Sequence, residues 1–335
     1  MSPRQRVASG GSGIGCWLFW GAHVLWLPAL MVGYVLWVGK LVLYSRRAPG
    51  TTTMLASVYP RWMMHRVRQR RDDACVRLVR VLPNVSQPGL WLLAAPTLLV
   101  YRLTGYLPKL FRYPYPGVPS MNEQPAARTT FFDTALARHL PEIEQLVILG
   151  AGLDTRSYRL PAARSHVRCF EVDAPRGQAF KRAMLAKAGI DASRVTFVAA
   201  DFGREDWYEK LQAAGFDPRK PSFFLWESVT MYLDRPSVES TLKRIASTAH
   251  GSAVAFDYFS PELLEDRSPT WRYGRAILRV VAEPFGTFAL DTTPPASEHV
   301  AAFVASCGLT LEEQRSFGEE TGERHPLAGF ATAVA

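Results

Sequence analysis

Four apolar runs in the second half of the chain each end in acidic residues or in a glycine-rich turn. The first run, residues 145–149, continues into "GAGLD" at 150–154, and the next three end at Asp173, Asp201 and Glu227. In a parallel sheet the carboxyl ends of the strands lie at one edge, and ligands of such sheets bind there. These acidic side chains are therefore predicted to surround one site, where they suit cationic groups and hydroxyl donors.

The loop "LGAGLDTRSYRL", residues 149–160, keeps two glycines that allow close backbone approach to a ligand. A dinucleotide fingerprint requires a third glycine or alanine where this chain has Thr155, and no Gly-Lys-Ser/Thr of a triphosphate loop follows. The carboxylate of Asp154 would also repel a phosphate. The loop therefore does not predict a pyrophosphate ligand.

Asp173 lies about twenty residues beyond the glycine loop, the spacing at which a strand-end carboxylate accepts hydrogen bonds from ribose hydroxyls. A ribose without a pyrophosphate, next to carboxylates that suit a sulfonium and an ammonium, describes S-adenosyl-L-methionine. We therefore predict S-adenosyl-L-methionine as the cofactor. A second glycine-rich stretch, "GGSGIG" at residues 10–15, has no strand before it and is interpreted as a flexible lead-in.

The elements that position these residues alternate between strand and helix patterns, which is typical of a parallel sheet with helices on both faces. Strands are predicted over residues 145–149, 166–172, 194–200, 222–226 and 252–258, with two more candidates at 309–317 and 329–335. The sequence thus predicts an α/β domain with a doubly wound sheet.

The N-terminal region is strongly apolar. Residues 17–39 form an uninterrupted apolar run, and about 20 residues suffice for a helix to cross a bilayer. Trp17, Trp20, Trp37 and Tyr44 lie near its ends, as in the aromatic belts of membrane spans. A cleaved signal peptide is the alternative, but its apolar core is shorter and no A-x-A-like site follows here. We therefore predict an uncleaved membrane-spanning helix over residues 17–39.

A basic segment, residues 45–82, follows the apolar run and contributes to the formal net charge of +9. Basic residues concentrate on the cytoplasmic side of membrane spans, so we predict a single span with an outer N-terminus and a cytoplasmic catalytic domain. Their density beside a span also predicts contact with anionic lipid headgroups, and this position makes a nucleic-acid interface the weaker interpretation. The basic residues of this flank are Lys40, Arg46, Arg47, Arg61, Arg66, Arg68, Arg70, Arg71, Arg77 and Arg80.

A second apolar segment, residues 89–101, is too short for a simple span and contains Pro96. It is interpreted either as a re-entrant or interfacial element or as a buried core helix. The predicted organisation is a membrane-anchoring region over residues 1–112, a proline-rich linker over 113–125 and a cofactor-binding domain over 126–335. The four cysteines are scattered without a C-x-x-C pair, so neither a metal site nor a disulfide framework is indicated.

Five motifs occur in the order found in one known family. They are "ARTTFFD" (127–133), "LGAGLDTRSYRL" (149–160), "FEVDAP" (170–175), "DF" (201–202) and "WESVTMYL" (226–233). The chain resembles the leucine carboxyl methyltransferases and bacterial polyketide O-methyltransferases, which are class I S-adenosylmethionine-dependent enzymes. This resemblance implies a mainly parallel seven-stranded sheet with an antiparallel last pair, and a cap of inserted helices over the acceptor site. The N-terminal apolar region is a departure from soluble members of the family.

The resemblance also implies roles for individual residues. Arg128 would pair with the carboxylate of the cofactor's methionine moiety, and Gly150 and Gly152 would line the loop beneath it. Asp173 would hold the ribose, while its neighbour Glu171 would contribute to the site or be structural.

The remaining cofactor contacts come from the third and fourth strand ends. Asp201 and Phe202 would flank adenine, and Glu227 would face the ammonium of the methionine moiety. Ser228 stands where family members commonly have glycine. Tyr232 is interpreted as an acceptor-site wall or as a packing residue.

Methyl transfer from a sulfonium is an in-line displacement, so the protein must align the groups and exclude water. A carboxylate acceptor needs no general base, whereas a phenol would. No obvious partner carboxylate is indicated for His139, His166, His250, His299 or His325, which favours carboxyl methylation. The apolar N-terminal region favours a lipophilic carboxylic acid as acceptor. The alternatives are a phenol or hydroxyl acceptor, a protein C-terminal carboxylate, and a non-catalytic membrane scaffold.

Two groups of arginines remain. Arg156 in "DTR" is predicted to be an internal ion-pair partner. Arg272, Arg275 and Arg279 recur at helical spacing in the insertion 261–290 and are interpreted either as a solvated basic face or as groups that orient an anionic substrate.

Overall fold

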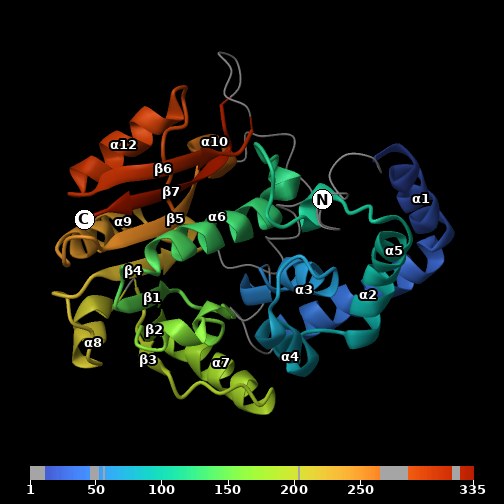
Figure 1. Ribbon diagram of the computed structural model, residues 1–335, viewed down its shortest axis with the longest axis horizontal. Helices are drawn as coiled ribbons and strands as arrows, with labels where there is room; N and C mark the ends of the chain where they lie inside the picture. Colours follow the sequence, from blue (N-terminus) through green and yellow to red (C-terminus); the bar gives the residue numbers. More distant parts are fainter. Residues whose placement is uncertain (1–11, 46–52, 56, 203, 265–285, 319–324) are drawn as a thin grey trace.

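The computed structural model describes residues 12–45, 53–55, 57–202, 204–264, 286–318 and 325–335, and a seven-stranded sheet lies at its centre (Figure 1). Every predicted strand is present, with ends that differ from the prediction by no more than two residues. The strands are β1 (Gln145–Leu149), β2 (Arg168–Asp173), β3 (Val195–Ala199), β4 (Ser222–Trp226), β5 (Ala253–Phe259), β6 (Thr310–Ser316) and β7 (Ala328–Val334).

The strand order is β3-β2-β1-β4-β5-β7-β6. The first five strands in the chain pair in parallel, and β7 pairs antiparallel with both β5 and β6. This arrangement confirms the predicted doubly wound sheet with an antiparallel last pair. The reversal of strand order at β1 places a ligand-binding edge at the carboxyl ends of β1 and its neighbours.

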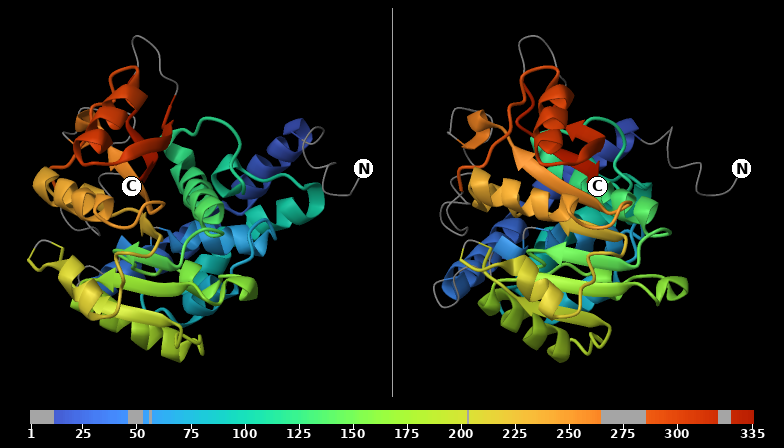
Figure 2. Two further views of the ribbon diagram at one scale, coloured as in Figure 1. Left: turned by 60° about the vertical axis from the view of Figure 1, so that its left-hand side comes forward. Right: turned by 90° about the vertical axis from the view of Figure 1, so that its left-hand side faces the viewer.

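Helices cover both faces of the sheet, as the two further views in Figure 2 show. On one face, α8 (Trp207–Ala213), α9 (Arg235–Ala246) and α12 (Ala296–Ser306) pack against strand residues such as Val147 and Phe224. On the other face, α6 (Gln124–His139) packs against the alternate residues Leu146 and Leu225, with α7 (Pro175–Lys187) beside it over β2 and β3. The alternation follows from the two-residue period of a strand.

The N-terminal apolar run forms two helices, α1 (Ser12–Leu25) and α2 (Leu27–Ser45), so the prediction of one span over residues 17–39 is wrong in its bounds. Pro28 has no backbone N–H, which removes one hydrogen bond at this junction. Among the described residues, one stretch, Leu27–Tyr44, is long and apolar enough to cross a membrane, and 11 % of its residues are buried. A signal sequence near the N-terminus passes the same test.

The other N-terminal helices are α3 (Val58–Arg66), α4 (Asp73–Val81) and α5 (Gln87–Thr104), and α1 to α5 group together beside α6 and α7 (Figure 1). α5 contains the second apolar segment and packs on α1 and α2. At the crossing with α2, a β-carbon on Gly89 would lie 2.8 Å from the Gly33 carbonyl oxygen, so the backbones approach closely. α5 is buried on this side, yet Leu99 and Leu103 remain exposed.

The N-terminal helices share a hydrophobic cluster with the cofactor-binding part of the chain. Trp62, Met63 and Leu90 pack in one cluster with Leu153 of the glycine loop. Tyr115, within the predicted linker, is buried, and its backbone N–H donates to Thr130 Oγ1 of α6 over 2.8 Å. The domain division remains a prediction, and these contacts join its parts tightly.

Short helical turns complete the connections. α10 (Pro261–Leu264) follows β5, and the three arginines at 272, 275 and 279 lie outside the described residues. The 3-10 helices are η1 (Thr53–Leu55), η2 (Lys109–Phe111), η3 (Met121–Glu123), η4 (Arg156–Tyr158), η5 (Ala162–Arg164) and η6 (Thr230–Tyr232).

Candidate functional site

The glycine loop after β1 lies against the end of β2. Gly150 has a φ of 63°, and a β-carbon there would meet Val229 Cγ2 at 2.3 Å, so this position requires glycine on two grounds. The Gly152 N–H donates to Asp173 Oδ2 over 2.6 Å. Asp173 is therefore tied to the glycine loop at the edge of the sheet, as its predicted role requires.

The residues predicted at the other strand ends lie along the same edge, because β3, β2, β1 and β4 are consecutive in the sheet. Asp201 and Phe202 follow β3 and are half-buried, and the Phe202 ring lies 5.9 Å from that of Trp207. Glu227 follows β4 directly. Tyr232 lies in η6 and packs against the hydrophobic cluster between α6 and the sheet, which leaves both of its predicted roles open.

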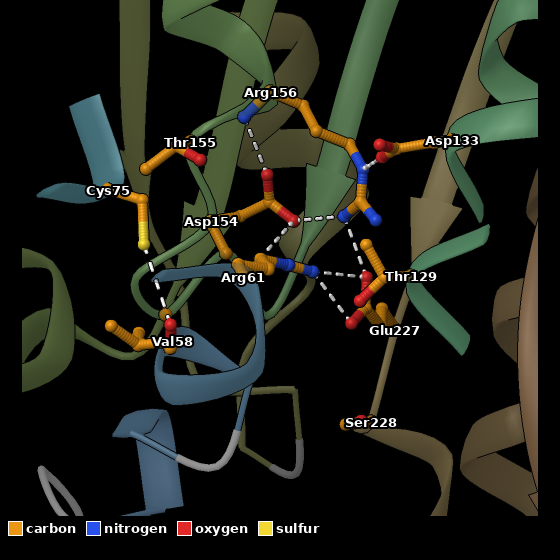
Figure 3. Close-up of polar contacts among 12 residues, drawn as sticks. Val58, Arg61, Cys75, Thr129, Asp133, Asp154, Thr155, Arg156, Glu227 and Ser228 are labelled. Carbon is orange, nitrogen blue, oxygen red and sulfur yellow. Dashed lines mark hydrogen bonds and ion pairs between the residues drawn. The ribbon is translucent and has the colours of Figure 1, made fainter. Parts of the chain in front are cut away.

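Three arginines converge on Glu227, whose side chain is 6 % exposed, and Figure 3 shows two of them, Arg61 and Arg156. Arg61 Nη2 donates to both carboxylate oxygens over 2.7 Å. Arg156 Nη1 donates to Oε2 over 2.6 Å, and Arg128 Nε lies 3.1 Å from Oε1. Arg156 also pairs with Asp154 of the glycine loop. The prediction that Arg156 is an internal ion-pair partner is confirmed.

The same network extends into the N-terminal region. Arg156 Nε donates to Asp133 Oδ1 over 2.7 Å, and Arg70 Nε donates to Asp133 Oδ2 over 2.7 Å. Arg70 also pairs with Asp72, which accepts a hydrogen bond from Thr155 Oγ1 over 2.8 Å. The residues of the glycine loop are thus held by Arg61 on α3, by Asp72 at the N-cap of α4 and by Asp133 on α6.

These ion pairs correct the interpretation of the basic segment. Arg61 and Arg70 were expected to face lipid headgroups, but both are 2 % exposed and pair with buried carboxylates. Arg71 is 89 % exposed and pairs with Asp73 on the surface. Only part of the basic segment is therefore available to a lipid surface.

Burial and neighbouring charges shift the pKa values of these carboxylates in opposite directions. Burial alone would raise the pKa of Asp133, but Arg156 and Arg70 hold that pKa well below its usual range. Burial also tends to raise the pKa of Glu227, but the charges of Arg61 and Arg156 outweigh this effect, so its pKa is lowered. Both groups are therefore anionic near neutral pH and suit a cationic ligand.

The pKa of Asp257 on β5 shifts in the opposite direction. Burial raises its pKa to about 6, and Arg128 opposes the rise. Its carboxylate accepts a hydrogen bond from the Ser228 N–H over 2.8 Å, and Arg128 Nη1 donates to Ser228 Oγ over 2.6 Å. Ser228, at a φ of 61°, therefore connects Asp257 to the arginine predicted to bind the cofactor's carboxylate.

The site fits the predicted cofactor on its donor and acceptor chemistry. Arg156 Nη2 is a buried N–H group without a hydrogen-bond partner, and Arg128 Nε, 3.1 Å from Glu227 Oε1, makes an ion pair there but no well-aligned hydrogen bond. Buried polar groups are normally satisfied, and a ligand carboxylate would supply acceptors for such donors. Glu227 and Asp173 supply acceptors for an ammonium and for ribose hydroxyls.

Glu171 and His139 pair with other side chains of the protein and are not part of the proposed cofactor site. Glu171 pairs with Lys181 Nζ over 2.6 Å, with both side chains 1 % exposed, which supports its structural alternative. His139, which the sequence left without a partner carboxylate, lies 3.0 Å from Glu312 Oε2. His139 ends α6 before β1 begins, at the amino end of the sheet, and so lies away from the strand-end acids.

The sequence analysis missed Arg61, Arg70 and Asp133 as members of the site. Asp133 is the last residue of "ARTTFFD", and this position was a usable signal. The sequence around Arg61 and Arg70 gave no such signal, because basic residues are frequent throughout this segment and lipid contact explains them more simply.

Comparison with known proteins identifies the central part of the chain. The profile of the family described as "Leucine carboxyl methyltransferase" matches residues 112–246. This stretch resembles the leucine carboxyl methyltransferase family. The family match contains the glycine loop, Asp173, Asp201 and Glu227, together with Arg128 on α6.

Two curated relatives carry the provisional name S-adenosyl-L-methionine-dependent methyltransferase. One from Mycolicibacterium vanbaalenii is 41% identical over 155 residues, which cover 44% of this chain and 50% of the relative. One from Mycobacterium tuberculosis is 34% identical over 212 residues, which cover 61% of this chain and 66% of the relative. The chain thus spans between half and two thirds of the length of these relatives.

Solved structures with a similar arrangement include an O-methyltransferase family protein from Burkholderia thailandensis. It is 12% identical, with 64% of this chain and 59% of that chain covered, at a TM-score of 0.39.

Proposed function

We propose that the chain is an S-adenosyl-L-methionine-dependent methyltransferase that binds its cofactor at the carboxyl edge of the sheet. The observation that carries this proposal is the pairing of Asp173 with the glycine loop on the same edge as the buried carboxylate of Glu227. Asp173 would accept hydrogen bonds from the ribose, and Glu227 would pair with the ammonium. Asp201 and Phe202 would flank adenine, and Arg128 would bind the carboxylate.

When bound, this cofactor supplies an electrophilic methyl group. The residues of the chain bind and orient it, and buried aromatic and aliphatic side chains such as Trp226 and Met231 exclude water around the strand ends. Tyr232 would contact the acceptor from η6. Positioning of this kind suffices when the acceptor is already an anion, because no proton has to be removed.

We propose a carboxylate of a lipophilic small molecule as the acceptor. Its apolar body would remain in lipid while its carboxylate reaches the site. A hydroxyl acceptor is the second candidate, and one observation favours it: Asp257, with a pKa raised to about 6, lies next to Ser228 and could accept a proton. A protein C-terminal carboxylate is a further alternative.

The type of product separates these candidates. We expect the labelled methyl group transferred from S-adenosyl-L-methionine to a lipid extract to be released as volatile methanol under mild base, because carboxylic methyl esters hydrolyse and aryl or alkyl methyl ethers do not. A product that keeps its label in mild base would contradict carboxyl methylation and support a hydroxyl acceptor. Label recovered in protein would point to a polypeptide carboxylate.

We propose membrane association through α1, α2 and α5. These helices expose large apolar side chains, and contiguous patches of that kind mark lipid or partner surfaces. The exposed residues include Trp17, Leu18, Trp20, Val24, Leu25, Met31, Val32, Val35, Leu36, Leu99 and Leu103. Because α2 packs closely against α5, the three helices would enter the lipid together. The predicted single span, with an outer N-terminus and a cytoplasmic catalytic domain, stays a prediction.

Vesicle flotation tests this surface. The full-length protein should float with phospholipid vesicles, and a variant combining Trp17→Asp, Leu25→Asp and Val35→Asp should stay in the dense fraction, because charged groups resist burial in lipid. These three side chains are 80%, 86% and 68% exposed, so the changes spare the core. Val118→Asp, at a position 58% exposed in the predicted linker, is the matched control and should float. Flotation of the triple variant like the parent would refute the assignment.

A further inference from the structure

Arg61 holds the carboxylate that the proposed cofactor needs. Its Nη2 donates to both oxygens of Glu227 over 2.7 Å, and its Nη1 lies 3.5 Å from Asp154 Oδ2. One nitrogen thus bonds both oxygens, and such charge-assisted hydrogen bonds are roughly twice as strong as neutral ones. An ammonium that pairs with Glu227 must therefore compete with Arg61 for the same oxygens.

Glu227 does not require Arg61 for charge compensation. Arg156 Nη1 lies 2.6 Å from Oε2 and Arg128 Nε lies 3.1 Å from Oε1. Three guanidinium groups thus face one carboxylate. The ammonium of a cofactor could pair with Glu227 only if one of these groups left. Arg128 and Arg156 belong to α6 and η4, which are built into the sheet domain. Arg61 belongs to α3, in the N-terminal helical region, and so is the one of the three that lies outside the sheet domain.

A second residue of the same region covers the other end of the proposed cofactor site. Met54 lies in η1, directly before α3. A β-carbon on Gly177 would lie 2.6 Å from Met54 Cε and 3.1 Å from Asp173 Oδ1, so the Met54 methyl group lies beside the carboxylate predicted to hold the ribose. Met54 Cγ would also lie 3.6 Å from a β-carbon on Gly152. Met54 thus lies at the ribose end of the site and Arg61 at its amino-acid end.

We propose that Met54 and Arg61 are built-in competitors of the cofactor, with Arg61 in the place of the cofactor's ammonium at Glu227 and Met54 over the ribose end at Asp173. The inference rests on the proposed cofactor site and is independent of the identity of the methyl acceptor. Binding of the cofactor then requires Arg61 to leave Glu227 and Met54 to leave Asp173. Each of the two residues lowers the apparent affinity by the fraction of molecules in which it occupies its part of the site, Arg61 at Glu227 and Met54 at Asp173.

Calorimetric titration of full-length variants tests the competition, because removing a competitor should tighten cofactor binding and removing a ligand should weaken it. Arg61→Gln should bind S-adenosyl-L-methionine at least about tenfold more tightly than the parent, because Arg61 no longer competes with the cofactor's ammonium for Glu227. Its affinity for 5′-methylthioadenosine, which keeps the ribose and adenine but lacks the amino-acid part, should change little. Arg71→Gln removes an exposed arginine that pairs with Asp73 on the surface, and it should leave both affinities unchanged.

Met54→Ala provides an independent variant in case Arg61→Gln fails to fold, as judged by thermal melting. It should tighten the binding of both molecules, because Met54 covers the ribose end that they share. Weaker binding of S-adenosyl-L-methionine to Arg61→Gln would make Arg61 a cofactor ligand and overturn the proposal, and unchanged affinities in both variants would also overturn it. Failure of the parent and all variants to bind either molecule would instead refute the proposed function, on which the inference rests.

Discussion

Replacing Asp173 with alanine should weaken the binding of S-adenosyl-L-methionine by about tenfold to a hundredfold, the loss expected for one or two hydrogen bonds to a charged group. The carboxylate would accept hydrogen bonds from the ribose, and it also holds the glycine loop through the Gly152 N–H over 2.6 Å. Isothermal titration of the folded variant measures the loss. Asp173→Asn, which keeps an acceptor for Gly152, should lie between alanine and the parent.

Asp191→Ala is the matched control for Asp173. Asp191 lies in the connection before β3 and accepts a hydrogen bond from the Ser193 N–H over 2.9 Å at the surface. Removing it should leave cofactor affinity unchanged. Equal affinities of the parent and Asp173→Ala would show that this carboxylate does not hold the cofactor, and the assignment of the strand-end acids would then fail at its strongest point.

Arg156→Met should destabilise the protein by about 3 to 5 kcal/mol, because breaking a buried ion pair leaves uncompensated charge in the interior. Arg156 is 1 % exposed and pairs with Asp133, Asp154 and Glu227. Methionine retains an apolar stem, so the change removes mainly the charge and its hydrogen bonds. Urea unfolding followed by tryptophan fluorescence gives the free energy of unfolding.

The control for this prediction is Arg219→Met. Arg219 pairs with Asp217 over 3.0 Å at the surface, where ion pairs contribute little. It should unfold like the parent. A midpoint for Arg156→Met within error of the parent would contradict the view that the network around Glu227 holds the glycine loop in place.

The sheet was predictable from the sequence because its signals are local. Apolar runs such as residues 145–149 and 222–226 stand out from the helical patterns between them, and each became the strand expected. Their ends carry Asp173 and Glu227, and parallel pairing alone brings these residues to one edge. The candidate cofactor residues therefore follow from strand ends and spacing.

The role of the N-terminal region could not be predicted in the same way, because its contacts are long-range. Arg61 pairs with residues 93 and 166 positions away, and nothing in its local sequence distinguishes it from the exposed Arg71. The break between α1 and α2 had a local signal in Pro28, which the length of the apolar run concealed. Packing decided which arginines of the basic segment are buried and which face solvent.

Because the N-terminal region supplies buried ion-pair partners, its membrane role is better tested with point variants than by truncation. Deleting residues 1–111 would remove Arg61, Arg70 and Asp72, and with them partners of Asp154, Asp133 and Thr155. The remaining carboxylates would lose compensating charge, so a truncated protein would test stability together with substrate access. Point variants on the exposed faces of α1, α2 and α5 separate the two, because their side chains lie outside this network.

Methyl transfer by the full-length protein tests the central claim most directly. The protein is incubated with S-adenosyl-L-methionine labelled in its methyl group and with vesicles that contain a cellular lipid extract, and the lipid, protein and water-soluble fractions are then counted. The account predicts label in a lipid species heavier by one methyl group, and little label with Asp173→Ala. Cofactor binding by the parent without label in any fraction would contradict the account and identify the chain as a non-catalytic membrane scaffold.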